Sequence, residues 1–271
     1  MMIALKNISV RFNTGTVDEV LALKNISLEI GGSEFVTVIG TNGSGKSTLL
    51  NVVAGNIMAD EGQVLLNGRD MTRLPSFRRA DVLSRVFQNP YMSTAPDMSI
   101  AENLLMAWLR GKTRYPRFSL NKKLMALFSD RLLELELGLE SRMHNAAGTL
   151  SGGQRQAVTL LMAVLQKPKI LLLDEHTAAL DPKTAAQVSK LTTRFIDAGQ
   201  LTALMVTHSM KQALEMGSRI IMMHKGQIIS DIPAKEKELL SVEDLLGKFD
   251  KIRKKEKLTP EMLANFVRQY V

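Results

Sequence analysis

A glycine-rich segment between two apolar runs constrains the fold more than any other part of this 271-residue chain. Residues 40–47 read GTNGSGKS, which fits the spacing G-x-x-x-x-G-K-[ST]. The segment follows the apolar run 35–39 and precedes a helix-like series that begins at Leu49. In this context, backbone N–H groups and the positive end of the following helix form a nest for polyphosphate oxygens. The segment therefore predicts a nucleoside triphosphate site, with a chance glycine-rich turn as the alternative.

The residues of this segment divide into side chains with a chemical role and backbone that surrounds the phosphates. Lys46 is expected to reach the terminal phosphates, and the Ser47 hydroxyl can bind Mg²⁺. The other candidate binding residues are Gly40, Thr41, Asn42, Gly43, Ser44, Gly45 and Thr48. By itself the segment leaves kinases, GTPases and motor ATPases open.

The rest of the chain alternates short apolar runs with amphipathic segments, which indicates an α/β fold with a largely parallel sheet. Strands are expected at residues 8–12, 35–39, 64–66, 82–87, 170–173 and 201–206, with a hairpin over 219–223 and 227–232. Asp181-Pro182 predicts a helix start, and that helix ends near Gly199. Between Ser99 and about residue 165 the pattern is helical, and Ser99 with Glu102 fits a capping box. A helical segment inserted into an α/β core is therefore expected.

Two carboxylates follow the apolar run 170–173, at the tip of an expected buried strand. The tips of parallel strands face the ligand crevice of an open α/β sheet. Asp174 suits Mg²⁺, and Glu175 suits a general base that polarises the attacking water. A solvated acidic pair after a strand is the alternative.

A second candidate anion site lies in the helical insert, where residues 150–154 read LSGGQ. Ser151 and Gln154 have the spacing of a capping box, so the segment should begin a helix. Gly152 and Gly153 are expected to let backbone amides approach another molecule closely. A single triphosphate is not expected to bind both anion sites unless two chains come together.

With these motifs in this order, the chain resembles an ATP-binding cassette (ABC) nucleotide-binding subunit over nearly all of residues 1–235. The resemblance implies a P-loop NTPase core, with an antiparallel β subdomain and an inserted helical subdomain. It also implies a head-to-tail dimer, a homodimer in the simplest case, in which LSGGQ covers the γ-phosphate of ATP bound by the partner. The cofactors implied are ATP and Mg²⁺.

The resemblance also implies roles in that site for further residues. Phe12 matches the aromatic residue that stacks on adenine, although by itself it could be a core residue. Gln88 matches the glutamine that senses Mg²⁺ and the γ-phosphate and connects to membrane subunits. Asp181 matches the aspartate that acts across the dimer, and His208 the histidine that contacts the γ-phosphate. His176 departs from the family, which usually has proline there.

The resemblance is to cassettes of bacterial amino-acid uptake systems, within them to a group associated with tryptophan or tyrosine uptake. The implied partners are a second ABC subunit, integral membrane permease subunits and a solute-binding protein. The alternatives are an ATPase of an exporter or lipoprotein-extraction complex, and a non-transport ABC protein acting on DNA or ribosomes. The last class typically has two cassettes in one chain or a long coiled coil, so no nucleic-acid partner is expected.

Composition narrows the kinds of partner and chemistry that are expected. Thirty-five basic against 27 acidic residues give a net charge of +8, which suits anionic partners, and the absence of cysteine excludes disulfides and thiolate chemistry. No segment has the apolar length to span a bilayer, so a cytoplasmic protein held at the inner face of the membrane by permease subunits is expected. The expected division is a core of residues 1–88 and 160–235, a helical subdomain 89–159 and a helical extension 236–271. In the extension, one helix through Leu239, Leu245 and Phe249 is expected, and a second helix is expected to open at Thr259-Pro260. The segment from Arg110 to Lys123 carries six basic residues and is expected to be an exposed loop.

Overall fold

The computed structural model describes residues 1–111 and 120–255. Its contacts divide the chain into two compact units, Met1–Arg73 with Leu204–Val271, and Leu74–Ala203. The helix expected to open at Thr259-Pro260 lies outside the described residues, as does most of the basic segment from Arg110 to Lys123. None of the described helices is both long and apolar enough to cross a membrane.

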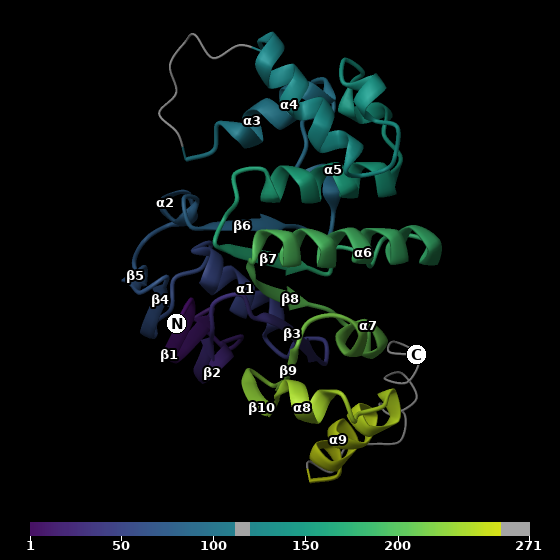
Figure 1. Cartoon of the computed structure of the whole chain (residues 1–271). Helices are drawn as coiled ribbons and strands as arrows, with labels where there is room; N and C mark the ends of the chain where they lie inside the picture. The colour runs from purple at the N-terminus through teal and green to yellow at the C-terminus, as the bar shows by residue number, and fades with distance from the viewer. Residues whose placement is uncertain (112–119, 256–271) are drawn as a thin grey trace. The chain divides into compact units, whose positions relative to one another are not determined.

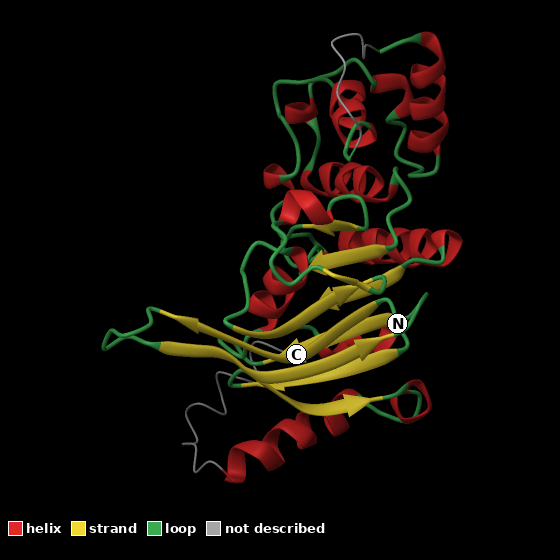
Figure 2. Ribbon diagram, turned by 90° about the vertical axis from the view of Figure 1, so that its left-hand side faces the viewer, coloured by secondary structure: helices red, strands yellow, loops and turns green. Residues whose placement is uncertain are grey.

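The first unit contains an antiparallel sheet with the strand order β2-β1-β4-β5. Its strands are β1 (Ile3–Phe12), β2 (Val20–Ile30), β4 (Glu61–Leu66) and β5 (Arg69–Asp70). Strand β2 was not predicted, because Lys24 and Asn25 separate its apolar run, residues 20–23, from the alternating residues Ile26, Leu28 and Ile30. The pairing with β1 shifts register at the same place. Figure 1 labels these four strands, and Figure 2 draws all the strands of the chain in yellow. The expected antiparallel β subdomain is therefore present.

The same unit holds the strands that carry the glycine-rich loop, in the order β10-β9-β3-β8. They are β3 (Phe35–Gly40), β8 (Thr202–Val206), β9 (Arg219–His224) and β10 (Gln227–Ile232). Strand β3 is buried along its whole length and pairs in parallel with β9, while β9 and β10 form the predicted antiparallel hairpin. Helix α1 (Lys46–Ala54) follows β3, as predicted.

The C-terminal part of the described chain covers the first unit. Where one helix through Leu239 was expected, the structure has α8 (Ala234–Lys237) and α9 (Val242–Lys255), because Ser241 begins a new helix by accepting a hydrogen bond from the Asp244 N–H. Leu245 and Phe249 of α9 are buried in a cluster with α7 (Met210–Glu215) and strands β9 and β10 (Figure 1).

The second unit pairs β6 (Leu83–Val86) in parallel with β7 (Ile170–Asp174) and is otherwise helical. Its helices are α2 (Ser76–Arg79), α3 (Ile100–Trp108), α4 (Lys122–Leu133), α5 (Gly152–Val164) and α6 (Pro182–Gly199), with 3₁₀ turns η1 (Pro90–Met92), η2 (Glu140–Arg142) and η3 (Ala147–Thr149). Both predicted capping boxes are present, and Asp181 caps α6 as predicted. The fold class is therefore α/β with a helical segment between strands, as predicted.

Candidate nucleotide-binding site

The glycine-rich loop lies in the first unit and joins β3 directly to α1. Gly45 caps α1 in the left-handed conformation with a φ of 97°. A Cβ atom at Gly45 would lie 2.6 Å from the carbonyl oxygen of Ala22, so only glycine fits there. The Lys46 ammonium is buried and donates to the carbonyl oxygens of Gly40, at 2.7 Å, and Thr41, at 3.1 Å. Lys46 therefore reaches across the concave side of the loop.

The residues of this loop fit a polyphosphate group. The Ser44 hydroxyl is buried and has no hydrogen-bond partner within the described residues, so it is available as a donor. The first turn of α1 carries no acidic side chain that would oppose its positive end. Ser47, the second residue of α1, is exposed, as are Asn42 and Gly43 of the loop. The local geometry thus supplies donors and positive potential without a competing carboxylate.

The turn between β9 and β10 forms hydrogen bonds with the glycine-rich loop. Sequence analysis missed this contact. The Gly226 N–H donates to the Ser44 carbonyl at 3.0 Å, and the Lys24 N–H donates to the Gly226 carbonyl at 2.8 Å. The Thr41 hydroxyl lies 3.4 Å from His224 Nδ1. The Lys225-Gly226 turn itself was predicted, but nothing in a single sequence indicates that it touches a loop about 180 residues earlier.

Two more candidate residues lie in the first unit. Phe12 ends β1, where it pairs with Val20, and its exposed fraction of 39% argues against the alternative of a core aromatic. His208 is half-buried in the connection between β8 and α7. Ser209 caps α7, and its N–H donates to the Thr207 hydroxyl at 3.1 Å. The backbone beside His208 is therefore held by local hydrogen bonds.

The acidic pair lies in the second unit at the end of β7, as predicted. Asp174 Oδ2 accepts from Arg85 Nη2 at 2.5 Å, with side chains only 15% and 9% exposed. The Arg85 guanidinium also lies over the Phe87 ring, 4.6 Å from its centroid. Sequence analysis missed Arg85, because only the parallel pairing of β6 with β7 brings it beside Asp174. Gln88 is exposed just beyond β6, directly after Phe87.

The connection from β7 to α6 contains Glu175, His176 and Asp181. Glu175 is half-buried and has a φ of 44°, in the left-handed region. His176 is buried, and its burial lowers the pKa to about 4, so the imidazole is neutral at physiological pH. Asp181 is exposed, and hydrogen bonds from Thr184, whose N–H donates at 3.1 Å, lower the pKa of its carboxyl.

The LSGGQ segment forms an exposed helix N-terminus in the second unit. The Ser151 hydroxyl accepts from the Gln154 N–H at 3.3 Å, and the Gln154 side chain accepts from the Ser151 N–H at 3.2 Å. Ser151 and Gly152 are exposed, and the first turn of α5 carries no acidic side chain. The predicted anion site is therefore accessible from outside this unit.

Gly153 has a packing reason in addition to the one expected from the sequence. A Cβ atom there would lie 2.1 Å from Thr184 Cγ2, at the start of α6. At Gly152 the nearest atom would be Leu180 Cδ2, at an ordinary 3.8 Å. Gly153 is therefore required by packing inside this chain, and only Gly152 remains without such an internal reason.

Among the residues whose side chains the structure describes, no group of three or more His, Asp or Glu could hold a metal ion. In proteins Mg²⁺ usually takes one or two carboxylates together with phosphate oxygens and water. Ser47, Gln88 and Asp174 supply a hydroxyl, an amide and a carboxylate oxygen, which are suitable ligand types.

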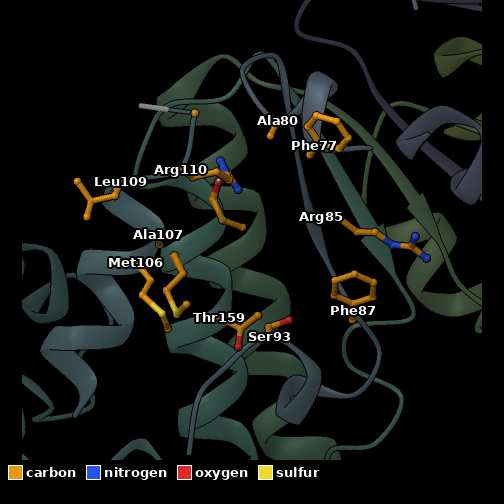
Figure 3. A pocket seen from close by; sticks show the side chains of 13 residues that line it. Phe77, Ala80, Arg85, Phe87, Ser93, Met106, Ala107, Leu109, Arg110 and Thr159 are labelled. Carbon is orange, nitrogen blue, oxygen red and sulfur yellow. Dashed lines mark hydrogen bonds between the residues drawn. The ribbon is translucent and has the colours of Figure 1, made fainter. Parts of the chain in front are cut away.

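The second unit also contains a pocket of about 470 Å³ beside the segment that leads to Gln88 (Figure 3). Its lining is mainly apolar and includes Phe87, Met106 and Met162. Among the atoms that line it, Ser93 Oγ, Arg110 Nε and Thr159 Oγ1 are buried and lack a hydrogen-bond partner within the described residues. Burial also lowers the pKa of Arg110. The pocket therefore offers polar atoms to a further hydrogen-bonding group.

Comparison with known proteins agrees with this geometry. The family model described as ABC transporter matches residues 23–178. The chain is 44% identical to the tyrosine transport ATP-binding protein of Clostridioides difficile (strain R20291), over 92% of this chain and 99% of that one. It is 35% identical to the phosphonates import ATP-binding protein PhnC of Lactococcus lactis subsp. cremoris (strain SK11), over 88% and 97%.

Solved structures show the same fold. The ATP-binding cassette MJ0796, in a dimeric post-hydrolysis state bound to ADP and Pi, superposes with a TM-score of 0.72 at 29% identity, over 86% of this chain and 99% of that one. The ADP conformation of MJ1267, a cassette of an ABC transporter, gives 0.74 at 27% identity, over 92% and 98%. The chain belongs to the ABC transporter family, as an ATP-binding cassette that is an ATPase.

Proposed function

We propose that this chain is the ATPase subunit of an uptake system for an amino acid, with tyrosine as the first solute to test. The observation that carries this proposal is the 44% identity to a tyrosine transport ATP-binding protein, which extends over 99% of that relative. The separate identity of 35% to a phosphonates import protein supports uptake as the direction of transport. The alternatives to uptake are a role in an exporter and a role in a lipoprotein-extraction complex, and the experiment below distinguishes them.

We propose that ATP is held by the glycine-rich loop, residues 40–48, with adenine stacked on the exposed ring of Phe12. Lys46 and the N-terminus of α1 hold the phosphates through their positive charge. Ser47, Gln88 and Asp174 would hold Mg²⁺, which supplies neutralisation of phosphate charge when it is bound. In the same proposal Glu175 takes a proton from the attacking water, and His208 contacts the γ-phosphate.

The working unit that we propose is a dimer in which each copy completes the site of the other. The exposed N-terminus of α5, with Ser151, Gly152, Gly153 and Gln154, supports this arrangement, because its N–H groups face outward without an acidic neighbour. Asp181, exposed at the start of α6, would act across the same interface. The solved dimeric structure of the cassette MJ0796 supports the same assembly. ATP then joins two copies, and its hydrolysis lets them separate.

We propose that the pocket beside Phe87 receives a cytoplasmic segment of the permease. Its apolar lining suits apolar side chains, and Arg110, whose Nε lacks a partner there, suits an acidic group. Exposed apolar side chains surround the same region of the second unit; they are Phe77, Tyr91, Met92 and Met106. Such a contact would place the chain on the inner face of the membrane.

The division into a core, a helical subdomain of residues 89–159 and an extension of residues 236–271 is part of the same proposal. The burial of Leu245 and Phe249 in the first unit supports a covering role for the described part of the extension. A solute-binding protein would deliver the solute to the permease, and nucleic acid has no role.

The proposal is tested by purifying the tagged full-length chain from membranes and identifying the integral protein that accompanies it. Two results would support the proposal: a permease co-purifies with the chain, and uptake of labelled tyrosine is lost with Lys46→Ala. Uptake that is unaffected by this variant, or a co-purifying exporter, would contradict it. Met106→Glu places a charge in the pocket and should abolish co-purification, whereas Leu239→Glu, at a side chain that is 85% exposed in the first unit, should not.

A further inference from the structure

His176 ties the segment that carries Glu175 to the body of α6. Its side chain is almost entirely buried, with an exposed fraction of 1%, although it lies in a connection between two elements. The ring atom Nε2 lies 2.9 Å from Thr192 Oγ1, in the middle of α6. The contact therefore joins the residue next to Glu175 to a helix position sixteen residues further along the chain.

The direction of this hydrogen bond follows from its neighbours. Thr192 Oγ1 also lies 2.8 Å from the carbonyl oxygen of Val188, which can only accept. The single hydroxyl hydrogen of Thr192 therefore points to Val188, and the hydroxyl oxygen accepts from His176. This assigns the Nε2–H tautomer to His176, in a chain of bonds from imidazole to hydroxyl to helix backbone.

Other contacts shape the connection locally. The Ala178 N–H donates to the Glu175 carbonyl at 3.0 Å, and the Leu180 N–H donates to the Thr177 carbonyl at 3.2 Å. These bonds close turns within the connection, but they do not join it to the middle of α6. The left-handed φ of Glu175 is unfavourable for a residue with a side chain, so it persists only where the surroundings hold it.

We propose that His176 is a positioning residue for Glu175: its bond to Thr192 fixes the backbone from which the Glu175 carboxylate is presented. The inference rests on the proposed role of Glu175 as general base. Because a base acts only within hydrogen-bond reach of the water, a small displacement of its backbone lowers turnover while leaving nucleotide binding intact. His176 itself touches neither ATP nor the reacting atoms in this proposal.

The experiment compares ATP hydrolysis and ATP binding in the full-length chain at a concentration that saturates turnover. Thr192→Val keeps the shape of the side chain and removes the acceptor, so kcat should fall about tenfold or more. The Kd for ATP, measured with a fluorescent analogue, should stay within about twofold. Thr192→Ser keeps the hydroxyl and should retain most of kcat. A Thr192→Val variant with a lower melting temperature but full kcat would overturn the proposal.

A second pair of variants keeps the test decisive if Thr192→Val does not fold. The side-chain nitrogen of Gln can occupy the place of Nε2, so His176→Gln should keep about half or more of kcat. His176→Leu, which fills similar space without a donor, should fall as far as Thr192→Val. Equal kcat in the two His176 variants would overturn the positioning role.

The variant Glu175→Gln tests separately whether Glu175 is the general base. Full turnover in Glu175→Gln removes the role of Glu175 itself. Loss of turnover in Glu175→Gln together with full turnover in Thr192→Val removes only the positioning role of His176.

Discussion

Arg85 Nη2 and Asp174 Oδ2 lie 2.5 Å apart and form an ion pair that is mostly shielded from water. The pair joins β6 to the end of β7, where the proposed Mg²⁺ ligand and general base follow each other. Figure 3 shows the Arg85 guanidinium pointing away from Met106 and Arg110, although the stem of Arg85 lines the pocket. One arginine therefore pairs with the proposed Mg²⁺ ligand and also lines the candidate docking pocket.

Replacing Arg85 by Met should destabilise the protein, because it leaves Asp174 as an uncompensated, mostly buried charge. We expect a loss of about 3 kcal/mol in the free energy of unfolding, the lower end for a broken buried pair, since Asp174 keeps some access to solvent. Urea denaturation of the purified chain measures this loss. Arg85→Met combined with Asp174→Leu should recover part of it, and a loss below about 1 kcal/mol in the single variant would show that the pair contributes no more than an exposed one.

Replacing Glu175 by Gln should lower kcat for ATP hydrolysis by about 10²–10⁴, the usual contribution of a general base. Binding of ATP should persist, because the glycine-rich loop and Lys46 are unchanged. Steady-state hydrolysis and equilibrium nucleotide binding separate the two effects. Near-normal turnover in this variant would remove Glu175 from the role.

Replacing Ser151 by Arg should abolish hydrolysis while each copy still binds ATP, because the large side chain blocks the exposed N-terminus of α5. The substitution also removes the N-cap of α5, which costs about 1 kcal/mol. Ser151→Ala is the matched control, since it removes the cap without blocking the surface, and it should retain more activity. Normal hydrolysis by Ser151→Arg would contradict the shared site, as would full activity of a chain that is verified as monomeric by light scattering under assay conditions.

Replacing Gly153 by Ala should destabilise the protein by about 1–3 kcal/mol, because the added methyl group overlaps with the Thr184 side chain. Gly152→Ala is the matched control on the same helical turn, and it should be close to neutral because the nearest atom there is 3.8 Å away. Combining Gly153→Ala with Thr184→Ser should restore most of the lost stability. Thermal or denaturant unfolding of the four proteins measures this, and equal stability of the two alanine variants would refute the packing explanation.

Acidification should destabilise the protein through His176. Burial lowers the pKa of His176 to about 4 in the folded chain, whereas the pKa of an unfolded histidine stays at its ordinary value of 6.5. Between these values only the unfolded state binds the proton, so stability is fully present above pH 6.5 and falls as the pH drops toward 4. The histidine contributes up to about 3 kcal/mol to this fall. His176→Gln should lose less stability over the same range in urea titrations at several pH values, and identical pH profiles would contradict the assignment.

Local pattern determined much of this protein. The loop of residues 40–47, the paired capping residues at Ser99 and Ser151, and the start of α6 at Asp181 all follow from interactions between residues a few positions apart. The same short-range rules missed β2, because Lys24 and Asn25 interrupt its apolar pattern. They also placed one helix where Ser241 divides two. Short-range rules therefore predict where elements begin more reliably than which elements pair.

Tertiary structure decided the contacts that no short-range rule contains. Arg85 meets Asp174 only because β6 and β7 pair in parallel, and His176 meets Thr192 only because the connection folds back on α6. The same holds for Gly153, whose neighbour Thr184 comes from a different helix and adds a packing reason for the glycine. The amino-acid sequence by itself determined the family and the chemistry of the loop, because both are read from motifs of neighbouring residues. It also determined the starts of helices, because backbone conformation and capping are short-range. Which charged, polar and small side chains meet depends on how distant segments pack, and only the folded chain settles that.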